Sequence, residues 1–296
     1  WALASHPASG PWNSAASSMI RMGFESLSRR VSMKLDADQL ALMPGITPAD
    51  ISQRARAAKG HGVRGVFLQP SRRDDEVKLD ETLLACCRDE RLPIVLLERN
   101  LRGPNRLLET DLVSADDLDG AARCTRHLLE LGRKRIALVA GPITSGHDDR
   151  LAGYLLAIHS SQCCSRRKSV EHKAIVLGHG EEYPDRDSFA KLIEFIRKQG
   201  IDGLVCCADY TAVGLMVELL ARGITVPGQV AVAGFDDLPI GNWLSIGVTT
   251  YAHPAEGIAE QAVRLMRDRI ANPDQAAIKV VVPGRLIVRE STIGKG

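Results

Sequence analysis

The sequence lacks the short motifs that mark common enzyme classes. It contains no Gly-x-Ser-x-Gly, no Walker phosphate loop and no Gly-x-Gly-x-x-Gly after a strand. The neighbouring carboxylates Asp236 and Asp237 have no third ligand at a spacing useful to a metal. We therefore expect neither an enzyme nor a protein with a metal or cofactor.

Aromatic residues and net charge are also scarce. Aromatics make up 4% of the chain, which argues against a surface that stacks RNA bases. The net charge of +2 creates no field that favours nucleic acid or membrane. Basic clusters at 72–73, 133–135 and 166–168 are dispersed, and none lies in a recognition-helix pattern. Nothing in this chain is expected to read bases.

Signals for membranes and secretion are missing as well. No stretch approaches the ~20 apolar residues of a membrane span, and the first residues do not resemble a signal peptide. Six of the seven cysteines form the adjacent pairs 86–87, 163–164 and 206–207, a poor disulfide framework that suits a reducing cytoplasm. We expect a cytoplasmic protein with no membrane partner, in which Cys206 and Cys207 serve as small apolar residues of a strand.

Short apolar runs alternate with segments of helical period, a pattern typical of βαβ units around a parallel sheet. The expected strands are 65–69, 93–97, 136–140, 174–177, 203–207, 230–233 and 280–282. The expected helices are 14–29, 47–61, 79–90, 118–131, 150–160, 188–199, 212–222 and 255–271. Residues 31–45 alternate poorly, so a strand, a helix and a loop all remain open there. The predicted fold class is α/β.

The run from Val230 to Asp237 is the most informative segment. A buried strand ends at Gly234, and two carboxylates follow at the sheet edge where open α/β sheets bind ligands. This pair of carboxylates suits a polyhydroxylated or amine-bearing small molecule. The alternative is that Asp236 or Asp237 only caps the next segment.

Several motifs in order resemble the effector-binding domain of LacI/GalR-type transcription regulators. They are Asp116–Ala121, His127–Gly132, Arg135–Pro142, Arg150–Tyr154, Ala208–Gly214, Gly223–Val232, Gly234–Asp237, Thr249–Thr250 and Leu286–Thr292. They span about two thirds of the chain. The first ninety residues agree only in general pattern.

The resemblance implies two Rossmann-like lobes of periplasmic-binding-protein type I architecture, joined by three crossings, with the ligand in the cleft between them. The first lobe would comprise 1–111 and 251–281, and the second 112–250 and 282–296. Segments 109–112 and 251–254 are the expected crossings. Periodicity alone cannot reveal such a discontinuous division.

Two charged residues lead the predicted effector site. Arg150, expected at the start of a helix after a loop at 146–149, offers a planar fork of donors to hydroxyls or a carboxylate. The resemblance gives it a role in effector binding, as it does for Asp236. Arg150 could instead pair with Asp148 or Asp149.

Asp209 departs from the family pattern. Such regulators often have Asn-Asp before this helix, whereas this chain has Ala208-Asp209. The missing amide removes one hydrogen-bonding group, so the effector differs or Asp209 is only a helix cap.

Four further residues complete the predicted site. Glu98 stands where the family often has aspartate and reaches about one methylene further. Tyr183 is placed like an aromatic that packs against a sugar or base, or it packs beside Pro184. The chain is also expected to begin inside or just before a first strand, and Trp12 and Asn13, which follow that strand, could contribute from the other lobe.

These inferences predict the effector-binding and dimerisation core of a LacI-like bacterial regulator. The effector is expected to be a sugar or sugar derivative, with a purine-type ligand open. The expected partners are a second copy, through helix 212–220 unless that helix is simply core, and operator DNA through a module upstream of Trp1 or downstream. A sugar-binding receptor of an ABC transporter is the main alternative, and an enzyme of unknown class is more distant.

Overall fold

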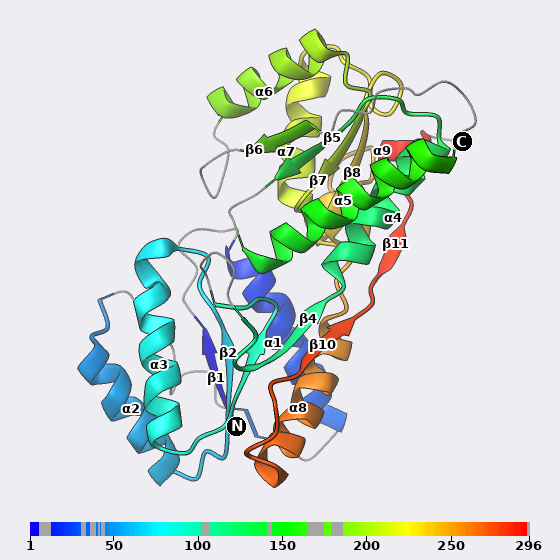
Figure 1. Ribbon diagram of the computed structural model, residues 1–296. Helices are drawn as coiled ribbons and strands as arrows, with labels where there is room; N and C mark the ends of the chain where they lie inside the picture. The colour runs from blue at the N-terminus through cyan, green and yellow to red at the C-terminus, as the bar shows by residue number, and fades with distance from the viewer. Residues whose placement is uncertain are drawn as a thin grey trace. The chain divides into compact units, whose positions relative to one another are not determined.

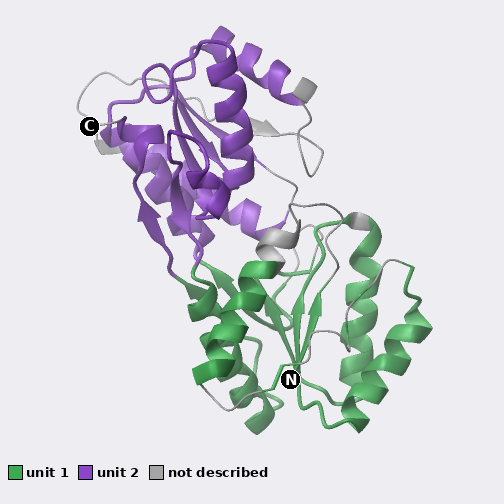
Figure 2. Ribbon diagram, turned by 180° about the vertical axis from the view of Figure 1, so that it is seen from behind, with its two compact units in different colours: residues 1–115, 254–282 green, residues 116–253, 283–296 purple. Residues whose placement is uncertain are grey.

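The computed structural model describes residues 1–5, 13–30, 34–35, 40, 42, 45–101, 107–140, 144–164, 175–178 and 186–294. The chain divides into two compact units (Figures 1 and 2). Unit 1 comprises 1–115 and 254–282, and unit 2 comprises 116–253 and 283–296, so the chain crosses three times. The boundaries inferred from the resemblance lie one to four residues earlier (111 against 115, 250 against 253, 281 against 282).

Unit 1 contains a five-stranded parallel sheet in the order β1-β2-β3-β4-β10. Its elements are β1 (Ala2–Ser5), α1 (Asn13–Arg30), α2 (Pro48–Gly60), β2 (Val66–Gln69), the 3-10 turn η1 (Asp74–Glu76), α3 (Val77–Asp89), β3 (Ile94–Leu97), β4 (Asp111–Ala115), α8 (Ala255–Ala271) and β10 (Lys279–Val282). This arrangement can be followed in Figure 1.

Helices cover both faces of the unit 1 sheet. Because successive side chains of a strand point to opposite faces, neighbouring residues of one strand are buried in two different cores. Phe67 of β2 belongs to the core that includes α1 and α8, where its ring lies 4.7 Å from that of Phe24. Its neighbours Val66 and Leu68 pack on the other face, in the core that includes α2 and α3. The continuous apolar runs of the sequence are thus explained.

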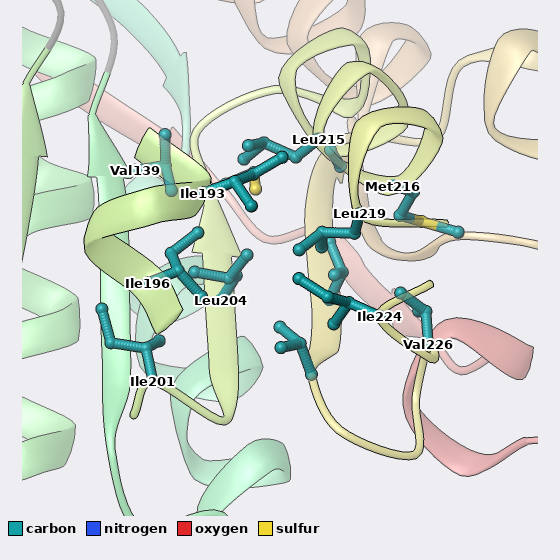
Figure 3. Packing of buried hydrophobic residues seen from close by; sticks show 14 of the residues in the cluster. Val139, Ile193, Ile196, Ile201, Leu204, Leu215, Met216, Leu219, Ile224 and Val226 are labelled. Carbon is teal, nitrogen blue, oxygen red and sulfur yellow. The ribbon is translucent and has the colours of Figure 1, made fainter. Parts of the chain in front are cut away.

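Unit 2 contains a six-stranded sheet in the order β11-β9-β8-β7-β5-β6, in which only the β11–β9 pair is antiparallel. Its elements are α4 (Asp117–Glu130), β5 (Ile136–Ala140), α5 (Ser145–Cys164), β6 (Ile175–Gly178), α6 (Arg186–Gln199), β7 (Gly203–Cys206), α7 (Asp209–Ala221), β8 (Ala231–Asp236), the 3-10 turn η2 (Pro239–Asn242), β9 (Thr249–Ala252), β11 (Arg285–Ile287) and α9 (Glu290–Ile293). Figure 3 shows a core in which α6, α7 and β7 meet through Ile193, Ile196, Leu204, Leu215 and Leu219.

Two expectations about side chains in unit 2 can be compared with this core. Cys206 and Cys207 are buried at the end of β7, and burial raises the pKa of the Cys206 thiol well above its usual value. The prediction that they act as small apolar residues is confirmed. In α7, Leu215 and Met216 belong to the core of their own unit, whereas Val217 is 45% exposed. Most of the apolar character of α7 is therefore explained by its own unit.

In each unit, a glycine lets the backbones of two crossing helices approach closely. In unit 2, a Cβ at Gly153 of α5 would lie 2.0 Å from the backbone oxygen of Leu118 in α4. In unit 1, a Cβ at Gly23 of α1 would lie 2.4 Å from the backbone oxygen of Ala255 in α8. Only glycine lets the two helix backbones approach this closely.

The predicted α/β class with two parallel-dominated sheets is confirmed, and several helix ends are confirmed with it. Thr47 and Asp50 form a capping box around Pro48, and Gly132 and Gly223 end helices with φ of +83° and +73°. Three strands were not predicted, namely β4, β9 and β11. Of residues 31–45, for which a strand, a helix and a loop were all considered, the structure describes only 34, 35, 40, 42 and 45. Among the described residues, no helix is both long and apolar enough to cross a bilayer.

Candidate functional site

Charged side chains of unit 2 gather where β5, β7 and β8 end. Arg150 reaches this edge from the second turn of α5, because the helix begins at Ser145. The expectation that 146–149 form a loop with Arg150 at the helix start is wrong. Thr144 explains the earlier start: its hydroxyl accepts a hydrogen bond from the backbone N–H of His147 at 3.3 Å, as a helix N-cap does.

The guanidinium of Arg150 is buried within a network of unit 2. Its Nε donates to Asp117 at 2.7 Å, and its Nη1 donates to the carbonyl of Cys207. Its Nη2 lies 3.8 Å from a carboxylate oxygen of Asp236. The guanidinium carbon also lies 4.2 Å from the centre of the Phe235 ring, close enough for a cation–π contact. Asp148 and Asp149 are thus not needed to explain the burial of Arg150.

Neighbouring carboxylates keep the guanidinium of Arg150 protonated. Burial alone lowers the pKa of the guanidinium, but the carboxylates of Asp117 and Asp236 raise the pKa by more, so that it ends above its usual value. A permanently charged donor group therefore lies beside the Asp236 carboxylate. Together they offer a ligand both donors and acceptors within one small area.

Asp236 ends β8 in an unusual backbone conformation. Its φ is +99° and that of Asp237 is +56°, a region that residues with a Cβ rarely adopt. The Asp236 side chain is 15% exposed, and within the described residues its carboxylate meets one cation, Arg150. Asp236 thus keeps hydrogen-bonding capacity at the sheet edge.

Asp209 occupies the first position of α7, where Ala208 is the N-cap, and its carboxylate is fully buried. One oxygen accepts from the backbone N–H of Leu238 at 2.7 Å, and the other accepts from the hydroxyl of Thr250 at 2.7 Å. Burial, followed by the charge of Asp236, raises the pKa of the Asp209 carboxyl well above its usual value. The absence of a side chain at Gly234 makes room, since a Cβ there would lie 2.2 Å from Asp209. This geometry suits a residue that holds the 236–238 turn.

Asp237 is turned toward a different cation. Its carboxylate accepts from Nη2 of Arg289 at 2.6 Å. The two neighbouring carboxylates therefore pair with separate arginines. Across the described ranges, no group of three His, Cys, Asp or Glu side chains is arranged to hold a metal ion.

Glu98 is the predicted site residue of unit 1 that the structure describes fully. It follows β3 with φ of +69°, and its side chain is partly exposed. The next residue, Arg99, is buried and donates to the carbonyl of Pro70 at 2.6 Å. Glu98 thus marks the carboxyl edge of the unit 1 sheet, as Asp236 does in unit 2.

The remaining predicted contacts cannot be compared with the structure. Trp12 and Tyr183 lie outside the described residues, and of Asn13 only the backbone, at the first position of α1, is described. Their roles remain predictions.

Sequence reasoning missed three residues of this edge: Asp117, Phe235 and Arg289. Asp117 follows the N-cap Asp116 and reads as an ordinary acid of a first helical turn, yet its side chain is only 5% exposed against Arg150. Phe235 and Arg289 lay inside the motifs that carry the resemblance, without a role assigned to them. The partners in these contacts lie far apart in sequence, by 52 residues in the case of Asp237 and Arg289, and no local pattern signals them.

Comparison with known proteins gives the family. A family model described as a periplasmic binding protein-like domain matches residues 125–292, more than half of the chain. The transcriptional regulator CelR of Thermobifida fusca is 28% identical over 236 residues, which are 78% of this chain and 64% of the relative. GalR of Escherichia coli K12 is 29% identical over 199 residues, 67% of this chain and 55% of the relative. The chain thus spans less than two thirds of these relatives, which are regulators rather than enzymes.

Solved structures share the fold across nearly the whole chain. A CelR–cellobiose complex has a TM-score of 0.73 at 24% identity and covers 98% of this chain and 84% of its own. A LacI family regulator of Enterococcus faecium with bound ribose has a TM-score of 0.69 at 20% identity, over 99% of this chain and 98% of its own. This chain therefore belongs to the periplasmic binding protein-like domain family, and within it the chain is similar to transcription regulators of the LacI/GalR type.

Proposed function

We propose that this chain binds a sugar or sugar derivative through the charged edge of unit 2 and thereby controls a DNA-binding module outside the chain. Asp236 accepts hydrogen bonds from the ligand hydroxyls, and Arg150 donates to them. Glu98, which follows β3 of unit 1, is proposed as a further acceptor. Tyr183, Trp12 and Asn13 are proposed as further contacts, and Asp209 supports the site from within.

The observation that carries this proposal is the Asp236–Arg150 pair. Its atoms are 3.8 Å apart, longer than a hydrogen bond, so the Asp236 carboxylate retains lone pairs for a ligand. The guanidinium is held by Asp117, Cys207 and Phe235, which fixes its orientation before a ligand arrives. Such fixed polar groups favour binding because little order is lost on association.

A sugar is favoured by the balance of charge. Two carboxylates, Asp117 and Asp236, flank one guanidinium, so the edge has no excess positive charge and suits a neutral ligand with many hydroxyls rather than an anion. Structural relatives are complexes with cellobiose, ribose and xylulofuranose, which supports the same ligand class.

We infer further that the complete protein acts as a homodimer in the cytoplasm. The relatives are described as HTH-type regulators, and the chain covers 64% of CelR. The operator is then contacted by a helix-turn-helix module joined to this chain. A sugar alters DNA binding only to the extent that it binds two arrangements of the protein with different affinity. Sedimentation equilibrium of the chain should give twice the monomer mass, and a monomer at high concentration would remove the dimerisation claim.

The decisive experiment is calorimetric titration with cellobiose, D-ribose, D-xylulose and a purine base. We expect one sugar to bind, and Asp236→Asn, which keeps the shape of the side chain, to weaken that binding by roughly tenfold to a hundredfold, or 1.4–2.8 kcal/mol. Glu194→Gln on the exposed side of α6 is the matched control and should bind like the wild type. If only the purine binds, the effector is a purine rather than a sugar. If Asp236→Asn binds the sugar as tightly as the wild type, the site lies elsewhere.

A further inference from the structure

Two successive aspartates in left-handed conformation need an external restraint. Asp236 and Asp237 have φ of +99° and +56°, a conformation that residues with a Cβ keep only where their surroundings enforce it. A ligand that relies on the direction of the Asp236 carboxylate relies equally on that restraint.

The interior of unit 2 supplies one part of the restraint. The N–H of Asp237 donates to the hydroxyl of Thr250 at 3.2 Å, and that hydroxyl donates to Asp209 at 2.7 Å. Asp209 also accepts from the N–H of Leu238. These bonds hold the backbone of the turn, but none of them holds the Asp237 side chain.

The segment between β11 and α9 supplies the other part. Arg289 donates through Nη2 to Asp237 at 2.6 Å and through Nη1 to the carbonyl of Val248 at 2.9 Å. Its own N–H donates to the hydroxyl of Thr249 at 2.8 Å. Arg289 therefore joins both ends of the chain segment from the Asp237 turn to β9.

The chain that follows Arg289 is anchored to the sheet through Ser291 of α9. The hydroxyl of Ser291 donates to the carbonyl of Val232 at 2.6 Å and accepts from the N–H of Thr249 at 2.8 Å. Both bonds are buried, and Ser291 is fully buried. Arg289 thus starts from a fixed backbone, and its fork reaches Asp237 with little remaining freedom.

We propose that Arg289 is the positioning residue of the effector site. It draws the Asp237 carboxylate to itself, which keeps the turn in the conformation that directs Asp236 toward Arg150. By neutralising Asp237, it also leaves the ligand one free carboxylate instead of two. Arg289 acts through Asp237 and does not touch the ligand. This role rests on the proposed binding of a sugar by Asp236.

The test is a double-mutant cycle on sugar affinity. We expect Arg289→Gln to raise the Kd for the tightest of cellobiose, D-ribose and D-xylulose by roughly tenfold, with Asp237→Asn giving a similar loss from the other partner. In an Asp236→Asn background, Arg289→Gln should cause no further loss, since there is no carboxylate left to direct. Arg289→Lys, which keeps the charge but loses the fork, should restore part of the affinity.

Arg285→Gln is the matched control, because Arg285 lies on β11 of the same segment and is exposed. Its Kd should equal that of the wild type. If Arg289→Gln is too unstable to measure, the cycle is measured with Arg289→Lys and Asp237→Asn, each combined with Asp236→Asn. Unchanged affinity in these variants, or losses that add to that of Asp236→Asn, would overturn the positioning role while the sugar site stands. Unchanged affinity in Asp236→Asn would overturn both.

Discussion

Both units place an acidic residue with positive φ at the end of a parallel strand, but they surround it differently. In unit 1, Glu98 follows β3, and the adjacent Arg99 donates to the carbonyl of Pro70. In unit 2, Asp236 ends β8, and the cation beside it, Arg150, comes from a distant helix and bridges to a second buried carboxylate, Asp117. The two strand ends are alike in backbone and unlike in electrostatics.

This difference indicates which of the two strand ends already has its charged groups held in place. The unit 2 edge holds its charged groups in place by buried contacts from α4, α5, β7 and β8. A ligand there meets groups that are already oriented, which lowers the cost of binding. The proposed site therefore rests mainly on unit 2.

The largest expected effect comes from breaking the unit 2 network. Arg150→Ala leaves Asp117, 5% exposed, and Asp236, 15% exposed, without their shared cation. Removing one partner of a buried ion pair typically costs ~3–5 kcal/mol of unfolding free energy. Urea denaturation followed by circular dichroism would measure the loss, with Glu194→Gln as the control. A loss below ~1 kcal/mol would mean that water replaces the cation and that the edge is not rigid.

A smaller effect sharpens the comparison by changing one helix crossing in each unit. Gly153→Ala in unit 2 and Gly23→Ala in unit 1 each introduce a Cβ into the backbone of the facing helix, at 2.0 and 2.4 Å. Overpacking of this kind costs ~1–3 kcal/mol. Thermal unfolding would measure both losses.

Gly60→Ala in α2 is the matched control, because nothing lies within 4 Å of its Cβ position. A helical alanine in open space is expected to gain up to about 1 kcal/mol. Equal stability of Gly153→Ala and Gly60→Ala would show that the crossing of α4 and α5 adjusts freely.

The smallest effect concerns pH and again distinguishes unit 2. Burial lowers the pKa of His127, although Glu130 opposes this, and the ring contacts the hydroxyl of Thr292 at 2.9 Å. The unfolded chain then binds a proton more readily than the folded protein. The contribution of the neutral His127 ring to the free energy of unfolding should be fully present above pH 6.5, the ordinary pKa of histidine. That contribution should be lost as the pH falls from 6.5 toward the lowered pKa of His127 in the folded protein. His127→Gln should flatten this part of the stability–pH curve, and an unchanged slope would assign it to other groups.

Short-range patterns predicted the fold and part of the site. The buried run before Gly234 predicted both β8 and the acidic residue Asp236 at its end, because the strand and the turn lie next to each other in the sequence. β4, β9 and β11 border the chain crossings, and the first two were read as connections. Asp117 could not be found, because its partner Arg150 is 33 residues away and nothing in a first helical turn distinguishes a buried acid from a capping one. Asp209 was noticed, but its two internal donors become visible only once β9 and η2 are placed around α7.

The threefold crossing of the chain has a consequence for biosynthesis. Unit 1 needs α8 and β10 to complete its sheet and core, and unit 2 needs β11 and α9, whose residues 285–293 supply Arg289, Ser291 and Thr292. On the ribosome, unit 1 cannot finish folding until residues 116–253 of unit 2 have been made, and unit 2 cannot finish until all of unit 1 has been made. The nascent chain must therefore keep β5, β7 and β8 from misassociating until its last strand arrives, a stage at which aggregation competes with folding.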